Sequence, residues 1–206
     1  MTGHKRREHR RHRRTGLAAA TAAAALLLSA CGSDSDGGGP ASGSGTNFVT
    51  SDSGISTVAK GERRAAPRLQ GETLDGGQLD TADYQGKVLV LNVWGSWCAP
   101  CRAEAKHFVK VSEETKDQGV QFVGINTRDA AVQPALAFEE EEGITYPSLY
   151  DPTGRLLLRF DKGTLNPQAV PTTLIIDRDG RIAARGLGAQ SEEKLREMLD
   201  PVLAEK

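Results

Sequence analysis

Residues 87–104 decide the fold of this chain, and they read KVLVLNVWGSWCAPCRAE. The first half is a continuous apolar run rich in β-branched residues, which is typical of a central strand buried on both faces. Pro100 stands where the first turn of a helix tolerates proline, and apolar residues then recur at helical spacing until Gly119, which favours a helix end. The stretch therefore predicts a buried strand that leads into a helix, with Cys98 and Cys101 at the junction.

Cys98 and Cys101 stand three residues apart, so they lie one above the other if the second is in a helix, and they can close a small disulfide ring. The first cysteine stands at the helix N-terminus, where free N–H groups and the helix dipole favour a thiolate. The thiolate is the attacking species in disulfide exchange. The spacing therefore predicts Cys98 as a nucleophile that forms a mixed disulfide with a partner, and Cys101 as the thiol that resolves it.

Paired cysteines have two other common uses. A zinc site normally needs four ligands, but the third cysteine, Cys31, lies in a leader segment together with three of the four histidines, which leaves only His107. No metal is therefore expected. An inert structural disulfide suits an exported protein and stays open as an alternative, although a bridge between residues one turn apart constrains the unfolded chain little.

The chain beyond Gly119 alternates strand-like and helix-like segments. Strands are predicted at 120–125, 172–176 and 181–184, and helices at 132–142 and from Ser191 onward. A turn at 177–180 joins the last two strands into a hairpin, and Pro201 is expected to kink or end the last helix. The order of strand, helix, strand, helix, hairpin and helix predicts an α/β to α+β domain.

The charge of the chain is unevenly distributed. The net charge is −1 over 206 residues, but seven Lys and Arg residues and a single acid lie in residues 1–30. The rest of the chain has 19 basic and 26 acidic residues. The basic character therefore belongs to the leader, and the folded part shows no basic face of the kind that binds nucleic acid.

Residues 1–30 have the layout of an export signal, with a basic start, an apolar run at 17–30 and small residues before Cys31. The run has 14 residues, fewer than the roughly 20 needed to span a bilayer, so a permanent transmembrane helix is not expected. Arg13 and Arg14 leave the export route open between the general secretory and the twin-arginine pathways.

Residues 28–31, LSAC, resemble the cleavage box of bacterial lipoproteins. The resemblance implies that Cys31 becomes the mature N-terminus and carries a lipid, which would anchor an extracytoplasmic protein to the outer face of the cell membrane. An ordinary signal peptide that happens to end in cysteine is the alternative.

Residues 31–62 are dominated by Gly, Ser, Asp and Thr. Such a segment cannot bury enough apolar surface to offset the entropy lost on ordering. We therefore expect a flexible Gly/Ser-rich tether at 31–62, with an r.m.s. span of roughly 30 Å, between a signal peptide at 1–30 and a folded domain at 63–206.

Residues 93–104 resemble the active-site segment of the thioredoxin superfamily, closest to its ResA/TlpA-like branch of membrane-anchored thiol-disulfide reductases. Gly86-Lys87 and residues 170–174, VPTTL, match that branch as well. The resemblance implies an α/β, thioredoxin-like fold with a central mixed β-sheet flanked by helices and a central insertion at about 132–160. Ala105 departs from the branch, in which a proline often follows the glutamate.

The resemblance also implies roles for residues around the cysteines. Pro171 would be cis and face the disulfide, and the backbone of Val170 would pair with an extended substrate segment. Glu104, one helical turn after Cys101, would tune the thiol pKa values and proton transfer, although a solvated helix carboxylate is an equal alternative. Trp97 would shape the docking surface for substrates.

The resemblance implies a reductase of protein disulfides that needs no cofactor, with protein thiol or disulfide substrates that include apocytochrome c during cytochrome c maturation. A membrane thiol-electron donor would re-reduce it. Two other functions stay open. A thiol peroxidase shares the fold, but Ala99-Pro100 between paired cysteines does not match its usual motif. A non-catalytic lipoprotein binding module would use the disulfide only structurally.

Overall fold

The computed structural model describes residues 45–205 of the chain. The predicted signal peptide, Cys31 and the first part of the predicted tether lie outside the described residues. No helix within this described part is both long and apolar enough to cross a membrane.

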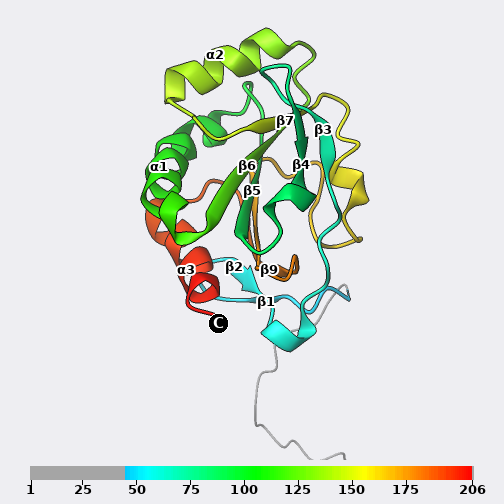
Figure 1. The fold of residues 1–206 in the computed structure, drawn as a ribbon, viewed down its shortest axis with the longest axis vertical. Coiled ribbons are helices and arrows are strands. Elements are labelled where there is room, and N and C mark those ends of the chain that lie inside the picture. Colours follow the sequence, from blue (N-terminus) through cyan, green and yellow to red (C-terminus); the bar gives the residue numbers. More distant parts are fainter. Residues whose placement is uncertain (1–44, 206) are drawn as a thin grey trace, which may run out of the picture. The chain divides into compact units, whose positions relative to one another are not determined.

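A mixed β-sheet forms the centre of the domain (Figure 1). The strands are β1 Val49–Thr50, β2 Ile55–Thr57, β3 Gln70–Glu72, β4 Gln78–Asp80, β5 Val88–Trp94, β6 Val120–Thr127, β7 Ser148–Asp151, β8 Thr172–Ile176 and β9 Ile182–Leu187. The main sheet has seven strands in the order β1-β2-β9-β8-β5-β6-β7, and β3 and β4 form a separate pair. β5, β6 and β7 run parallel, whereas the other neighbours are antiparallel. The predicted strands and the β8–β9 hairpin are confirmed.

Helices cover the sheet where the sequence predicts them. They are α1 Ala99–Thr115, α2 Val132–Glu142 and α3 Glu192–Leu203, with short 3-10 turns at Lys60–Glu62, Thr81–Tyr84, Lys116–Gln118 and Leu157–Arg159. Gly143 ends α2 in the left-handed conformation, and the Ser191 side chain caps α3 by accepting the backbone N–H of Lys194. Pro201 does not end α3, which continues to Leu203.

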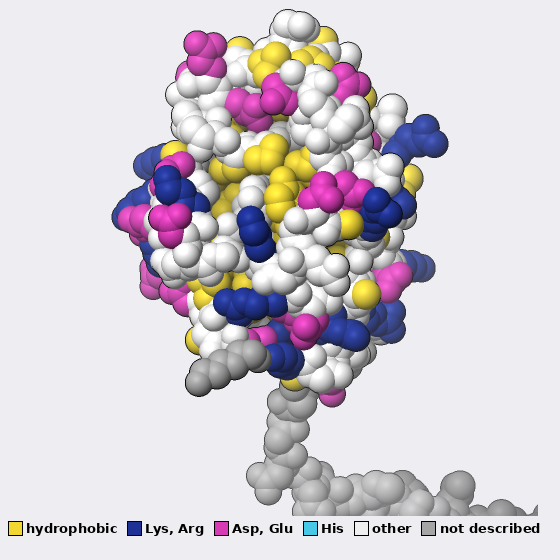
Figure 2. Space-filling view, in the orientation of Figure 1, with side chains coloured by type: hydrophobic (Ala, Val, Ile, Leu, Met, Phe, Trp, Pro, Cys, Tyr) yellow, Lys and Arg dark blue, Asp and Glu magenta, His cyan; other side chains and the backbone are white. Residues whose placement is uncertain are grey.

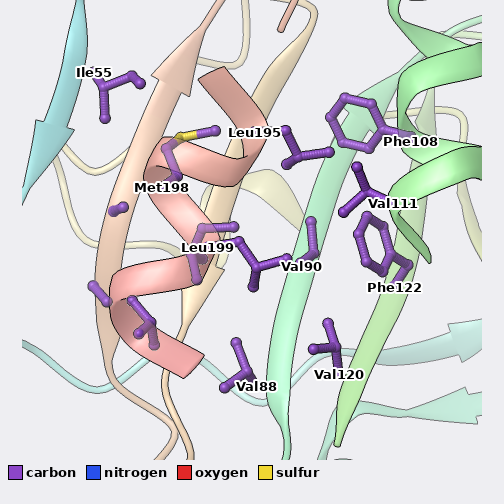
Figure 3. Packing of buried hydrophobic residues seen from close by; sticks show 14 of the residues in the cluster. Ile55, Val88, Val90, Phe108, Val111, Val120, Phe122, Leu195, Met198 and Leu199 are labelled. Carbon is purple, nitrogen blue, oxygen red and sulfur yellow. The ribbon is translucent and has the colours of Figure 1, made fainter. Parts of the chain in front are cut away.

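Successive side chains of β5 point to opposite faces of the sheet, and both faces are covered. Val88 and Val90 belong to a cluster with α1 and α3, and Figure 3 shows Phe108 of α1 and Leu199 of α3 on the same side as these valines. Leu91 faces the other way, toward the β3–β4 pair and residues 156–165. Burial on both faces explains why all residues of this strand except Asn92 are apolar.

The region in which the central insertion was expected, 132–160, forms α2, β7 and the Leu157–Arg159 turn. α2 carries the acidic run at residues 139–142. Figure 2 shows basic and acidic side chains mixed over the face that it views, around an apolar area. This face of the domain therefore does not present a surface of a single charge.

The prediction of a flexible tether was wrong for its last part, because residues 49–57 form two strands of the main sheet. β2 pairs with β9, and the N–H of Val58 donates to the carbonyl of Ala183 at 2.8 Å. Ile55 and Val58 are only 2% and 4% exposed. Short strands at the margin of a sheet need few apolar residues of their own, because their backbone groups bond to a neighbouring strand. The ordered domain therefore begins well before the predicted boundary at residue 63.

Candidate active site

Cys98 and Cys101 form a disulfide at the start of α1. Cys98 is the residue that precedes the helix, and its Sγ accepts the backbone N–H of Cys101 at 3.2 Å. Both cysteines are almost completely buried, at 3% and 2% exposure. The structure therefore places Cys98 where the free N–H groups and the dipole of the helix stabilise negative charge on its sulfur.

An apolar cluster from α1, β5 and the insertion surrounds the disulfide. Trp94 at the end of β5 stacks on Phe138 of α2, with 4.7 Å between ring centroids, and its Nε1 donates to the Ser148 hydroxyl of β7. Ala135 of α2 belongs to the same cluster. The insertion thus packs directly onto the redox pair and excludes water from one side of it.

Trp97 lies on the surface immediately before the first cysteine, where 48% of it is exposed. Its Nε1 donates to the carbonyl of Thr127 at 3.2 Å, and the Arg128 guanidinium carbon lies 4.3 Å from its ring centroid. A Cβ at Gly95 would come within 2.5 Å of the indole nitrogen, so only glycine lets the ring fold back over the loop. This placement agrees with a docking surface beside Cys98.

Asp129 also holds this loop, and nothing in the sequence pattern singles it out. Its carboxylate accepts the Ser96 N–H at 2.8 Å, the Ser96 hydroxyl at 2.6 Å and the Asn126 side-chain amide at 2.7 Å. The residue is 5% exposed. Buried carboxylates with several donors form strong hydrogen bonds, so the end of β6 fixes the backbone that leads to the first cysteine.

The peptide bond between Val170 and Pro171 is cis, as the resemblance predicts. Val170 is half-buried and packs against the cluster that contains both cysteines. None of the described residues forms a hydrogen bond with the Val170 backbone. A backbone N–H and C=O next to the disulfide are therefore available to an extended partner segment.

Glu104 is buried, at 2% exposure, so the alternative of a solvated helix carboxylate is wrong. One carboxylate oxygen accepts the side-chain amide of Asn92 on β5 at 2.9 Å, and the other accepts the backbone N–H of Gln190 at 2.8 Å. Burial raises the pKa of Glu104 to about 7, although both hydrogen bonds act in the opposite direction. The carboxyl group thus exchanges its proton near neutral pH, one helical turn from Cys101.

Comparison with known proteins agrees with this geometry. The Redoxin family model matches residues 59–200. Thiol-disulfide oxidoreductase ResA of Geobacillus kaustophilus is 28% identical over 157 residues, which cover 76% of this chain and 84% of the relative.

Two solved structures resemble the domain closely. A DsbF homologue from Corynebacterium diphtheriae is 36% identical, with a TM-score of 0.68, and the match covers 76% of this chain and 99% of that one. A secreted thiol-disulfide isomerase from Corynebacterium glutamicum is 30% identical, with a TM-score of 0.70, over 79% of this chain and all of the other. The chain therefore belongs to the Redoxin family and is a protein-disulfide oxidoreductase of the thioredoxin superfamily, of the ResA/TlpA-like type.

Proposed function

We propose that this protein works outside the cytoplasm as a reductase of protein disulfides. The observation that carries the proposal is the position of Cys98, whose sulfur lies at the N-terminus of α1 and accepts the N–H of Cys101. This environment stabilises a thiolate. The exposed Trp97, which precedes Cys98, and the free backbone of Val170 beside the cysteine pair provide the surface on which a partner can be bound.

The reaction transfers two electrons from the cysteine pair to the partner. In the reduced protein the Cys98 thiolate attacks one sulfur of the partner disulfide, and the other sulfur of that disulfide leaves as a thiolate. Cys101 then loses its proton and attacks the sulfur of Cys98, which releases the second partner thiol. The product is the Cys98–Cys101 disulfide that the structure contains.

We propose that Glu104 acts on the second step. A carboxylate one turn from Cys101 disfavours a second negative charge nearby, so it keeps that thiol protonated until resolution. Because burial raises the pKa of Glu104 to about 7, the same group accepts the proton that Cys101 loses on attack. The Glu104 carboxylate contacts Asn92 and Gln190 and neither sulfur, so we assign it a positioning and proton-accepting role.

The proposed partners follow from the family and from the leader segment. Relatives named ResA are thiol-disulfide oxidoreductases, and the resemblance to the ResA/TlpA-like branch supports apocytochrome c thiols as substrates during haem attachment. A membrane thiol-electron donor would restore the dithiol. An extracytoplasmic location is supported by the export signal at 1–30 and by the secreted relative from Corynebacterium glutamicum.

The direction of electron transfer is tested by the reduction potential of the mature protein, measured by equilibration with glutathione. A reductase should lie below about −200 mV, in the range of thioredoxin and the glutaredoxins. It should also reduce a model protein disulfide catalytically when a dithiol is supplied. A potential near about −120 mV, as in strongly oxidising enzymes, would contradict the proposal, and faster turnover of peroxide would favour a peroxidase.

Attachment to the membrane is a separate proposal that rests on Cys31, because it follows Leu28, Ser29 and Ala30 at the end of a short apolar run. In cells supplied with labelled fatty acid, we expect the full chain to take up label and the Cys31→Ala variant to lose essentially all of it. Cys98→Ser is the matched control and should be labelled like the wild type. Equal labelling of wild type and Cys31→Ala would show that the chain has an ordinary signal peptide.

A further inference from the structure

Two arginines flank the cysteine pair, and their surroundings differ. Arg102, directly after Cys101, lies across from α2 and binds the carboxylates of Glu141 and Glu142 at 2.8 and 2.7 Å. Its guanidinium also covers the ring of Phe138, at 4.8 Å from the centroid. The positive charge of Arg102 is therefore satisfied within the domain and fastens α2 to the start of α1.

Arg128 is exposed and has no such partner. Its one interaction among the described residues is the stacking of its guanidinium on Trp97. The neighbouring carboxylate of Asp129 forms no ion pair with Arg128, because it is buried and binds Ser96 and Asn126. The guanidinium of Arg128, with its free N–H donors, is thus exposed next to Trp97, the residue that precedes Cys98.

The position of Arg128 is fixed from both sides. The carbonyl of Thr127 accepts the indole N–H of Trp97, and Asp129 binds the backbone of Ser96. Arg128 itself has a φ of 61°, a left-handed conformation that residues other than glycine adopt uncommonly. The guanidinium is therefore not a freely moving surface group, because the residues on both sides of Arg128 bind the active-site loop and the guanidinium lies over the Trp97 ring.

We propose that Arg128 makes this enzyme select protein substrates that carry an acidic side chain beside the reacting cysteine. The proposal rests on the proposed reductase function and adds its substrate class. A partner whose sulfur reaches Cys98 must come close to Trp97, because the two residues are adjacent. An arginine fork binds carboxylates in a planar, bidentate geometry and repels lysine. Leu187, half exposed on the strand that pairs with Thr172, adds an apolar contact on the cis-proline side of the site.

The experiment uses three disulfide peptides that differ only in the residues next to the cysteine, which are aspartate, asparagine or lysine. Turnover of each is measured with the mature protein and a dithiol, at low and at moderate salt. Exposed ion pairs contribute modestly, so kcat/KM should be about two- to fivefold higher for the aspartate peptide than for the asparagine peptide. The lysine peptide should be the poorest, and added salt should reduce the differences.

Variants at position 128 separate recognition from structure. Arg128→Gln should remove the preference, and Arg128→Lys, which keeps the charge but loses the planar fork, should keep only part of it. Arg128→Glu should invert the preference toward the lysine peptide. The ratio between peptides within one variant cancels any general loss of activity or change in thiol reactivity. Lys106→Gln is the matched control, since Lys106 is an exposed cation on α1, and it should leave the ratio unchanged.

The possible results distinguish this inference from the function on which it rests. If the wild type turns over all three peptides equally, or if Arg128→Glu keeps the wild-type order, the selection proposed here is wrong and the reductase function stands. If no peptide is turned over, the reductase function and the selection both fail.

Discussion

Replacement of Cys101 by serine is expected to trap the protein on its partners, whereas replacement of Cys98 by serine should abolish both turnover and trapping. Cys98 lies at the N-terminus of α1 with its sulfur next to a backbone N–H, so it should be the thiolate that attacks first. Without Cys101 the mixed disulfide on Cys98 has no internal thiol to resolve it. Turnover should fall by more than about 10³-fold in either variant, since loss of a reacting nucleophile costs orders of magnitude in kcat.

The measurement is the yield of mixed disulfides in non-reducing gels after exposure to a protein disulfide, together with catalytic turnover. Both variants should stay folded, because the disulfide closes a very short loop and contributes little to the stability of the domain. Thermal unfolding of the two variants checks this point. Trapping by Cys98→Ser and none by Cys101→Ser would reverse the assignment of the two roles.

Glu104→Gln should remove a large pH dependence of stability. The folded-state pKa of Glu104 is raised to about 7 from an ordinary value of 4.5. Between these values the folded state holds a proton that the unfolded state has lost. The stability that Glu104 contributes is therefore greatest below pH 4.5 and is lost as the pH rises through the folded-state pKa. The loss from this one group is about 3 kcal/mol by pH 8.

Glutamine at position 104 has nearly the same size and no charge. Its amide can keep both contacts if the side chain of Asn92 turns over, because an asparagine amide offers an acceptor as well as donors. Unfolding by denaturant from pH 5 to 8 should therefore show the variant gaining about 2.5 kcal/mol relative to the wild type. Glu140→Gln, at an exposed position on α2, is the control. Parallel curves for wild type and Glu104→Gln would mean that the carboxyl group stays ionised throughout.

The same variant tests the proposed role of Glu104 in catalysis. Removal of the charge should lower a cysteine pKa in the reduced protein and slow the resolution of the mixed disulfide, since the proton acceptor for Cys101 is lost. The pH dependence of alkylation and the rate of resolution measure the two effects separately. If neither the pH dependence of alkylation nor the rate of resolution changes, Glu104 has only a structural role.

The sequence predicted those parts of the fold whose signals are local. The continuous apolar run of β5 reflects burial on both faces, and the proline and cysteines after it mark the start of α1. Ser191 and Gly143 are residues whose own chemistry begins or ends a helix, and both predictions were confirmed. The cis bond at Pro171 was predicted by resemblance alone, because composition and spacing there indicate only a turn.

The parts that were missed depend on contacts between distant segments. The three-residue strands β3 and β4 are too short to show a periodic pattern. Whether Glu104 was solvated or buried depended on Asn92 and Gln190, which lie on other elements. Asp129 is an ordinary acid after a strand in the sequence, and only the folded chain brings it to Ser96.

The pairing of β2 with β9 also prevents β9 from pairing with a strand of another copy of the chain. Residues 55–57 occupy the backbone groups of residues 184–186, and the outermost strand, β1, has only two residues. A chain cut at residue 63 would expose the free edge of β9, which is a template for strand addition by a neighbour. Residues 55–57 therefore cover the edge of β9 and protect the chain against aggregation. A soluble version of the enzyme should retain them.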